Sequence, residues 1–318
     1  MFFYSVVRRR NLSHHSRSKH QHWVPQFYLR YFATPESRDS KTPQVWIFSK
    51  NHDDGDEQLT SVRNVCGKRY LYSPQQPDGG RDWSLDDRLT EVEGLLARVW
   101  PSLATDFVDL SDEHIRKALA LFVSITHMRH PDARESVERI HASLVDFFES
   151  GPKDADGTPM IESVEVRGES RPFDTSNWQE YKSQGKDGHD REFARMIQSE
   201  VGSMAKRLLE KRWSILLSDR DTFVSSDKPV VLSHANRERY GYGTKGVMIF
   251  FPISPSRLLV MDDLHDEPAN QYYGLVPTNA GAVNMTIWRN ATRFLITGRP
   301  VPEVLLEINS LAGTGGDA

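Results

Sequence analysis

The segment Lys19-His20-Gln21-His22-Trp23-Val24-Pro25-Gln26-Phe27-Tyr28-Leu29-Arg30-Tyr31-Phe32 is the most informative stretch of this chain. It places two histidines and five aromatic side chains within fourteen residues. Histidine is only intermediate in its tendency to be buried, and an ordinary core segment does not need two of them. The aromatic side chains of this segment suit a hydrophobic core or a stacking surface equally well, and the two histidines make it a candidate site.

The two histidines have the spacing of a strand pair. If residues 20–24 are extended, His20 and His22 project from the same face, because strand side chains alternate. Two imidazoles in that arrangement can bind a divalent metal when a carboxylate completes the set. In the alternative, His20 is exposed while His22 hydrogen-bonds a backbone carbonyl and orders the turn before Pro25.

Outward from this segment, the chain alternates between strand and helix patterns. Residues 44–48 are aromatic and β-branched, which predicts a buried strand. Apolar residues at three- and four-residue spacing predict an amphipathic helix over 85–99 that Pro101 closes. A second helix over 115–126 is expected to have Ser111 as its N-cap and to end or kink at Pro131.

Further periodic segments complete the predicted architecture. Helices are expected through 140–147, 191–213 and 283–295, and short strands at 214–217, 222–224, 230–232, 247–251 and 258–261. This order predicts an α+β fold. A mixed or antiparallel sheet from N- and C-terminal strands packs against a central set of helices.

Composition limits the classes of protein and partner. The 318 residues are enough for a large core, and a net charge of −4 gives no global reason to bind nucleic acid or an anionic membrane. The single cysteine, Cys66, excludes an intramolecular disulfide and a Cys-rich zinc site, so we expect a reducing, cytoplasmic location. The longest apolar run, 247–253, is too short to span a bilayer, so no membrane partner is expected.

Segment composition also suggests the domain boundaries. Residues 1–18 are basic and contain no acid, which predicts a disordered N-terminal extension. Residues 151–190 are rich in glycine, proline and charge and are interpreted as a polar loop insertion. Residues 299–318 are expected to form a C-terminal tail, with 19–298 as a single domain.

Four later motifs accompany the opening segment. They are Leu85-Asp86 with Val92-Glu93, Met128-Arg129-His130-Pro131, Phe223-Val224-Ser225-Ser226-Asp227-Lys228-Pro229-Val230 leading to Phe251-Pro252-Ile253-Ser254-Pro255, and Val283-Asn284 with Arg293. Together these motifs resemble the DUF4238 family, a mainly microbial group whose activity is not established. The resemblance spans about residues 19–298 and implies a shared fold and pocket but no reaction. Gln21 stands where many relatives carry a second histidine.

The motif residues offer candidate chemistry, each with a structural alternative. Asp227 is expected in a turn at a strand end, as a functional carboxylate or as a cap for backbone amides. Arg129 is expected to clamp an anion or form an internal ion pair, or else to meet the last carbonyls of its helix. Asp86 and Glu93 lie two turns apart on one helix side, where they bind a hard cation, pair with Arg129 or are solvated.

Two functional hypotheses follow. In the first, the protein is a hydrolase acting on a phosphate-containing or nucleic-acid substrate. His22 acts as general base or metal ligand, Asp227 as its carboxylate partner and Arg129 as anion clamp, and a divalent metal is held by His20, His22 and Asp227. In the second, it is a non-catalytic ligand-binding or regulatory protein in which the same residues are structural. Either way, the expected partner is a small molecule or nucleic acid.

Overall fold

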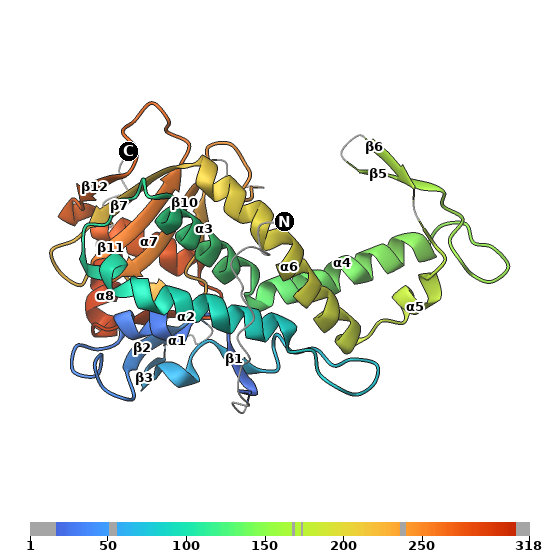
Figure 1. Ribbon diagram of the computed structural model, residues 1–318, viewed down its shortest axis with the longest axis horizontal. Helices are drawn as coiled ribbons and strands as arrows, with labels where there is room; N and C mark the ends of the chain where they lie inside the picture. The colour runs from blue at the N-terminus through green and yellow to red at the C-terminus, as the bar shows by residue number, and fades with distance from the viewer. Residues whose placement is uncertain (1–16, 51–55, 167–168, 173, 236–239, 310–318) are drawn as a thin grey trace.

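The computed structural model describes residues 17–50, 56–166, 169–172, 174–235 and 240–309. Over these residues the chain has an α+β fold in which helices pack against two larger β-sheets (Figure 1). The fold class expected from the sequence is confirmed. None of the described helices is both long enough and apolar enough to cross a membrane.

The first large sheet joins the two ends of the chain. Its order is β3 (Glu57–Ser61), β2 (Gln44–Ser49), β13 (Phe294–Thr297) and β8 (Ser225–Ser226), and every pairing is antiparallel. The strand expected at 44–48 is therefore confirmed. The strand expected at 222–224 is wrong by position, because the paired residues are Ser225 and Ser226.

The second sheet is built from the C-terminal half of the chain. Its order is β12 (Gln271–Gly274), β7 (Arg212–Leu217), β11 (Arg257–Asp262), β10 (Met248–Ser254) and β9 (Val231–Ser233). Only the β12–β7 pair is parallel, so the sheet is mixed. All six residues of β11 are buried, as expected for a strand that is covered on both faces.

Three helices surround the core beside these sheets, namely α2 (Ser84–Thr105), α3 (Glu113–Met128) and α6 (Lys186–Glu210). Helix α2 runs through Pro101, where the sequence predicted its end. The neighbouring Trp100 and Leu103 are buried, so packing of the last turn offsets the hydrogen bond that proline removes. The N-cap of α3 is Asp112 rather than Ser111, because its carboxylate accepts the backbone N–H groups of His114 and Ile115.

Helix α4 (Pro131–Glu149) leads away from the sheets, as Figure 1 shows. At its far end lie α5 (Trp178–Lys182) and the hairpin of β5 (Ser163–Val166) and β6 (Glu169–Pro172). The expected polar loop at 151–190 thus contains a hairpin, a short helix and the first turn of α6. That this segment is an insertion into one domain stays a prediction.

The C-terminal elements differ most from expectation. Helix α7 (Ala280–Asn290) ends before Phe294 and Leu295, which belong to β13 instead of the predicted helix 283–295. The tail expected at 299–318 is wrong over 301–309, where α8 (Val301–Asn309) packs against α7 and β2. Its apolar residues recur at helical spacing, and Val301, Val304 and Ile308 are buried. Residues 1–16 of the expected extension and 310–318 of the expected tail lie outside the described residues.

The opening segment enters the main core directly. Its strand β1 (His20–His22) pairs with β4 (Gly67–Arg69), and α1 (Gln26–Leu29) follows at once. The ring of Tyr28 stacks on that of Phe251 with centroids 5.3 Å apart, and it meets Trp100 edge-on at 5.8 Å. Aromatic side chains from one end of the chain are therefore packed between α2 and β10.

Candidate functional site

His20 and His22 lie on one face of β1, as expected. Their rings are in edge contact with centroids 4.8 Å apart. The ring of His20 passes over Gly67, where an added Cβ would come within 2.2 Å of it. A glycine is therefore required at this position for the observed ring placement.

His22 is held by two polar contacts. Its Nε2 lies 3.0 Å from the carbonyl oxygen of Arg63, and the amide nitrogen of Gln26 lies 3.3 Å from its Nδ1. A carbonyl only accepts, so Nε2 carries the proton and Nδ1 keeps a lone pair. Burial lowers the pKa of His22, and the charges of His20 and Arg129 lower it further against the effect of Arg63 O and Glu93. The carbonyl contact expected as the structural alternative is present.

Arg129 is a buried residue at the C-cap of α3. Its Nε donates to the carbonyl of Trp23 at 2.7 Å, and its Nη1 lies 2.5 Å from Oε1 of Glu93. Tyr72 donates its hydroxyl to the Arg129 carbonyl at 2.8 Å. The guanidinium is therefore committed to an internal ion pair, one of the alternatives that the sequence left open.

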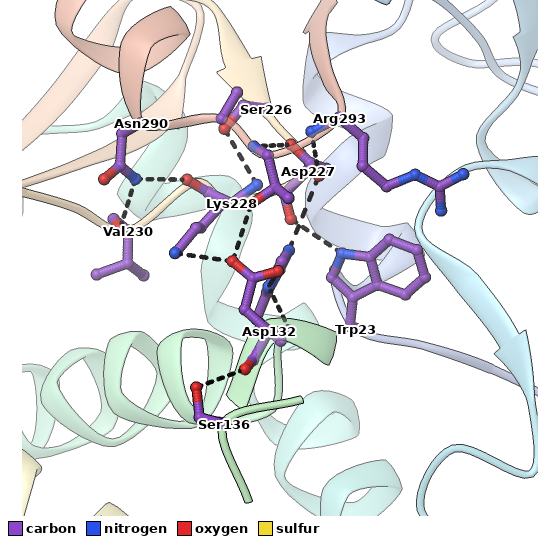
Figure 2. Close-up of polar contacts among 12 residues, drawn as sticks. Trp23, Asp132, Ser136, Ser226, Asp227, Lys228, Val230, Asn290 and Arg293 are labelled. Carbon is purple, nitrogen blue, oxygen red and sulfur yellow. Dashed lines mark hydrogen bonds and ion pairs between the residues drawn. The ribbon is translucent and has the colours of Figure 1, made fainter. Parts of the chain in front are cut away.

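Asp227 is fully buried and holds the turn between α7 and β13. Its carboxylate accepts the backbone N–H groups of Thr292 at 3.1 Å and Arg293 at 2.9 Å. The indole of Trp23 donates to the Asp227 carbonyl at 2.9 Å (Figure 2). This carboxylate caps backbone amides, as one alternative predicted, but those amides are more than sixty residues away in sequence.

A network that the sequence analysis did not identify lies between α4 and Asp227. The buried ring of His130 places Nδ1 3.4 Å from Asp132 Oδ1 and Nε2 3.8 Å from Asp227 Oδ2. Asp132 also meets Lys228 Nζ at 3.1 Å and the hydroxyl of Thr292 at 3.0 Å, and Figure 2 shows Lys228 pointing toward it. The available signal was the His-Pro-Asp order, since His130 Nδ1 accepts the Asp132 N–H and caps α4.

Charge in this network is shared between its members. Burial acts to lower the pKa of His130, but hydrogen bonds and charges from Asp132 and Asp227 outweigh burial and raise it. In return, His130 and Lys228 hold the pKa of Asp132 well below its usual range. The network therefore favours a protonated imidazole between two carboxylates. In that state the Nδ1–H group points to Asp132 Oδ1, and the bond from the Asp132 N–H forms only with the neutral ring.

Each of the three predicted catalytic residues contacts Trp23 or is adjacent to it in sequence. Arg129 bonds its carbonyl, Asp227 receives its indole N–H, and His22 precedes it in the chain. Within the part of the chain that the structure describes, no hydrogen bond joins the side chains of His22, Arg129 and Asp227 to one another. The three residues therefore share Trp23 as a common neighbour.

The metal-ligand set expected from the sequence is not assembled. Among the described residues, no group of three or more histidine, cysteine, aspartate or glutamate side chains is placed to hold a metal ion. The physical reason is that the Asp227 carboxylate faces the amides of Thr292 and Arg293, whereas His22 faces Arg63 and Gln26. His20, His22 and Asp227 thus do not form one coordination sphere.

A cleft of about 290 Å³ lies beside His22, and we call it the cationic cleft. It shares Gln26 and Arg63 with the contacts of His22. Three of its residues are exposed cations, three are apolar, and none of its described lining residues is acidic. The lining residues are Gln26, Phe27, Arg30, Lys41, Pro43, Val62 and Arg63.

Sequence reasoning did not find Lys41 or Arg63, because they lie in a loop and in a short 3-10 helix (Val62–Asn64) outside every motif. Only Arg30, in the opening segment, was near a recognised signal. A second hollow of about 500 Å³ beside the start of α6 is lined by both Glu180 and Lys186, so it favours neither sign of charge. The cationic cleft is the better candidate site.

A protein-family model with the description "Protein of unknown function (DUF4238)" matches residues 20–300 of the chain. The match covers most of the chain, so the protein belongs to the DUF4238 family. The resemblance predicted from the motifs is confirmed. No curated protein and no solved structure matches the chain.

Proposed function

We propose that the protein binds a phosphate-containing ligand in the cationic cleft. The observation that carries the proposal is the grouping of Arg30, Lys41 and Arg63 around one hollow whose described lining has no carboxylate. Guanidinium groups match phosphate oxygens in a bidentate geometry, and an ammonium adds a point charge. A local positive site of this kind is compatible with a net charge of −4, because the field near a cleft depends on the charges that line it.

Hydrolysis of that ligand is a second candidate function, favoured by the state of His22. Its lowered pKa keeps the imidazole neutral at pH 7, and its Nδ1 lone pair meets Gln26, which itself lines the cleft. When a water displaces the 3.3 Å contact from the Gln26 amide, Nδ1 of the neutral imidazole can accept a proton from that water, while Nε2–H stays bonded to the Arg63 carbonyl. In this proposal Arg129 and Asp227 are positioning residues that fix Trp23 and the chain around His22, and the His20–His22–Asp227 metal set takes no part.

Binding is tested by titrating the full-length protein with inorganic phosphate in a calorimeter. Arg63→Gln and Lys41→Gln should each weaken binding at least fivefold, and higher salt should weaken binding to the wild type. Arg98→Gln is the matched control, because Arg98 is exposed on α2 and does not line the cleft. Equal affinities for wild type, Arg63→Gln and Lys41→Gln would rule out the cationic cleft as the binding site.

Hydrolysis is tested separately with p-nitrophenyl phosphate and bis(p-nitrophenyl) phosphate. His22→Gln should lower kcat by about 100-fold or more with little change in KM, whereas His20→Gln should have a small effect. The wild-type rate should fall as pH decreases, with a midpoint below 6.5, because the base must be unprotonated. Bound phosphate without any turnover would leave a binding protein and reject the catalytic role of His22.

A further inference from the structure

The apolar part of the cationic cleft carries information about the ligand beyond its phosphate. Phe27 is half-buried, and its ring is fixed by contacts with Trp100 and Phe122 at centroid distances of 5.6 Å each. Pro43 and Val62 are buried beside it. A cleft for inorganic phosphate alone has no use for an apolar wall, since phosphate oxygens need donors on every side.

This apolar wall is also rigid. The backbone N–H of Val62 donates to the carbonyl of Pro43 at 3.0 Å, which ties the two wall segments together. The preceding Ser61 caps the short 3-10 helix through the N–H of Arg63 at 3.3 Å. The wall and the backbone of Arg63 are therefore held in fixed relative positions before a ligand arrives, which reduces the entropy lost on binding.

From this juxtaposition we infer that the cleft is a site for a nucleoside phosphate, either free or at the end of a strand. The phosphate lies against Arg63, Lys41 and Arg30, and the planar base lies on the partly exposed ring of Phe27, beside which the buried Pro43 and Val62 are packed. Bases stack on aromatic and apolar surfaces with little dependence on their identity. The inference rests on the proposed phosphate binding and names the class of ligand for that same site.

The size and polar groups of the cleft fit this assignment. At about 290 Å³ it is near the lower end of small-ligand sites, which suits one nucleotide rather than a folded nucleic acid. The Gln26 side chain offers both donors and an acceptor, the combination that meets the edge of a base. A guanidinium on the rim can serve the phosphate or stack on the base.

The experiment compares five probes on the wild-type protein: inorganic phosphate, ribose 5-phosphate, adenosine 5′-monophosphate, adenosine and a 5′-phosphorylated trinucleotide. The expected result is that the monophosphate binds about tenfold or more tightly than ribose 5-phosphate, which measures the base alone. Arg63→Gln should weaken the binding of ribose 5-phosphate and of adenosine 5′-monophosphate by a similar factor, and Arg98→Gln should weaken the binding of neither. If the trinucleotide binds more tightly than adenosine 5′-monophosphate, the site is assigned to a strand end. If the two bind equally, it is assigned to a free nucleotide.

Two results separate failure of this inference from failure of the proposed function. Equal affinities for ribose 5-phosphate and the monophosphate overturn the nucleotide assignment but leave phosphate binding intact. Absence of binding by every phosphorylated probe overturns both. Val62→Thr, which changes the polarity of the wall at nearly constant size, should reduce the preference for the base, and the wild-type comparison decides the matter even when this variant does not fold.

Discussion

Position 298 requires glycine because backbone carbonyl groups of another segment lie close to it. A Cβ on Gly298 would lie 2.5 Å from the carbonyl oxygen of Ala33 and 3.1 Å from that of Phe32. Both atoms belong to backbone that leads out of the opening segment, so neither can move without disturbing the core. We predict that Gly298→Ala lowers the free energy of unfolding by about 1–3 kcal/mol in urea denaturation.

The matched control is Gly94→Ala, at an exposed position inside α2 where an added Cβ meets nothing within 4 Å. There alanine should raise the free energy of unfolding by about 0.5–1 kcal/mol, because glycine loses more backbone entropy in a helix. Destabilisation of both variants to the same extent would contradict the assigned contact with Ala33.

The buried guanidinium of Arg129 supports a second prediction. Arg129→Met removes the bond to the Trp23 carbonyl and leaves Glu93 without its partner. Breaking a buried pair costs about 3–5 kcal/mol, and we expect the lower end because Glu93 is 29% exposed and water screens its charge. Arg139→Met, at an exposed position on α4, should change the free energy of unfolding by less than about 0.5 kcal/mol. A loss below about 1 kcal/mol for Arg129→Met in the same urea titration would argue against the structural role.

At the residue scale, the motifs contain residues with extensive polar contacts, but the sequence predicted few of the partners in those contacts. His22, Arg129 and Asp227 all occupy specific polar environments in the core or at its edge. Their partners are fixed by tertiary structure: the amides that Asp227 binds belong to Thr292 and Arg293, which no local pattern connects to it. A single sequence contains no signal for such long-range pairs.

At the element scale, the start of α4 depends on a titratable cap. In the neutral ring His130 Nδ1 accepts the Asp132 N–H, whereas in the protonated ring Nδ1 can only donate, and Asp132 Oδ1 lies 3.4 Å from it. The ring lies between two carboxylates, Asp132 and Asp227, that raise its pKa. A raised pKa in the folded state means that protonation stabilises the fold. This contribution is fully present below the ordinary value of 6.5 and is lost as pH rises through the folded-state pKa.

We therefore predict that the free energy of unfolding is higher for the wild type than for His130→Asn. This difference should be largest below pH 6.5 and should shrink as pH rises. Asparagine keeps a capping acceptor at every pH and does not titrate, so the change of the difference with pH reports the proton on His130. Burial lowers the pKa of His127 to about 4, so its effect has the opposite sign and largely cancels between the two proteins. Asp132→Asn should reduce the pH dependence. A difference that is constant or grows from pH 5.5 to 9 in urea titrations would disprove the assignment.

The elements also show where patterns of apolar residues decide structure and where packing overrides them. The strong stripes of α2 and α3 predicted both helices, but α2 continues past Pro101 because Trp100 and Leu103 are buried around it. Strand β12 was missed since it is short, largely exposed and defined only by parallel pairing with β7. Whether an element could be predicted depended more on how regularly its apolar residues recur than on which residue types it contains.

On the scale of the whole molecule, the fold is closed by contacts between the two ends of the chain. The sequence predicted that N- and C-terminal strands share a sheet, and such a sheet is present, but the strand that pairs with β2 is β13, whose first residues were predicted to be helical. It did not predict that the chain after β13 returns to this sheet, because a nine-residue helix has too few repeats for a clear signal. Helix α8 nevertheless covers part of a second apolar cluster that includes Val224, Ile287 and Leu295.

The role of α8 in closing the fold can be measured with two variants of the same helix. Val304 is fully buried against this second cluster, whereas Leu306 is 72% exposed. Val304→Ala should lower the free energy of unfolding by about 2–3 kcal/mol, through lost burial and a cavity that the two sheets cannot fill. Leu306→Ala should change it by less than about 0.5 kcal/mol. If residues from 299 onward were only a tail, both substitutions would be silent in urea denaturation, and the closure of the molecule would then rest on β13 alone.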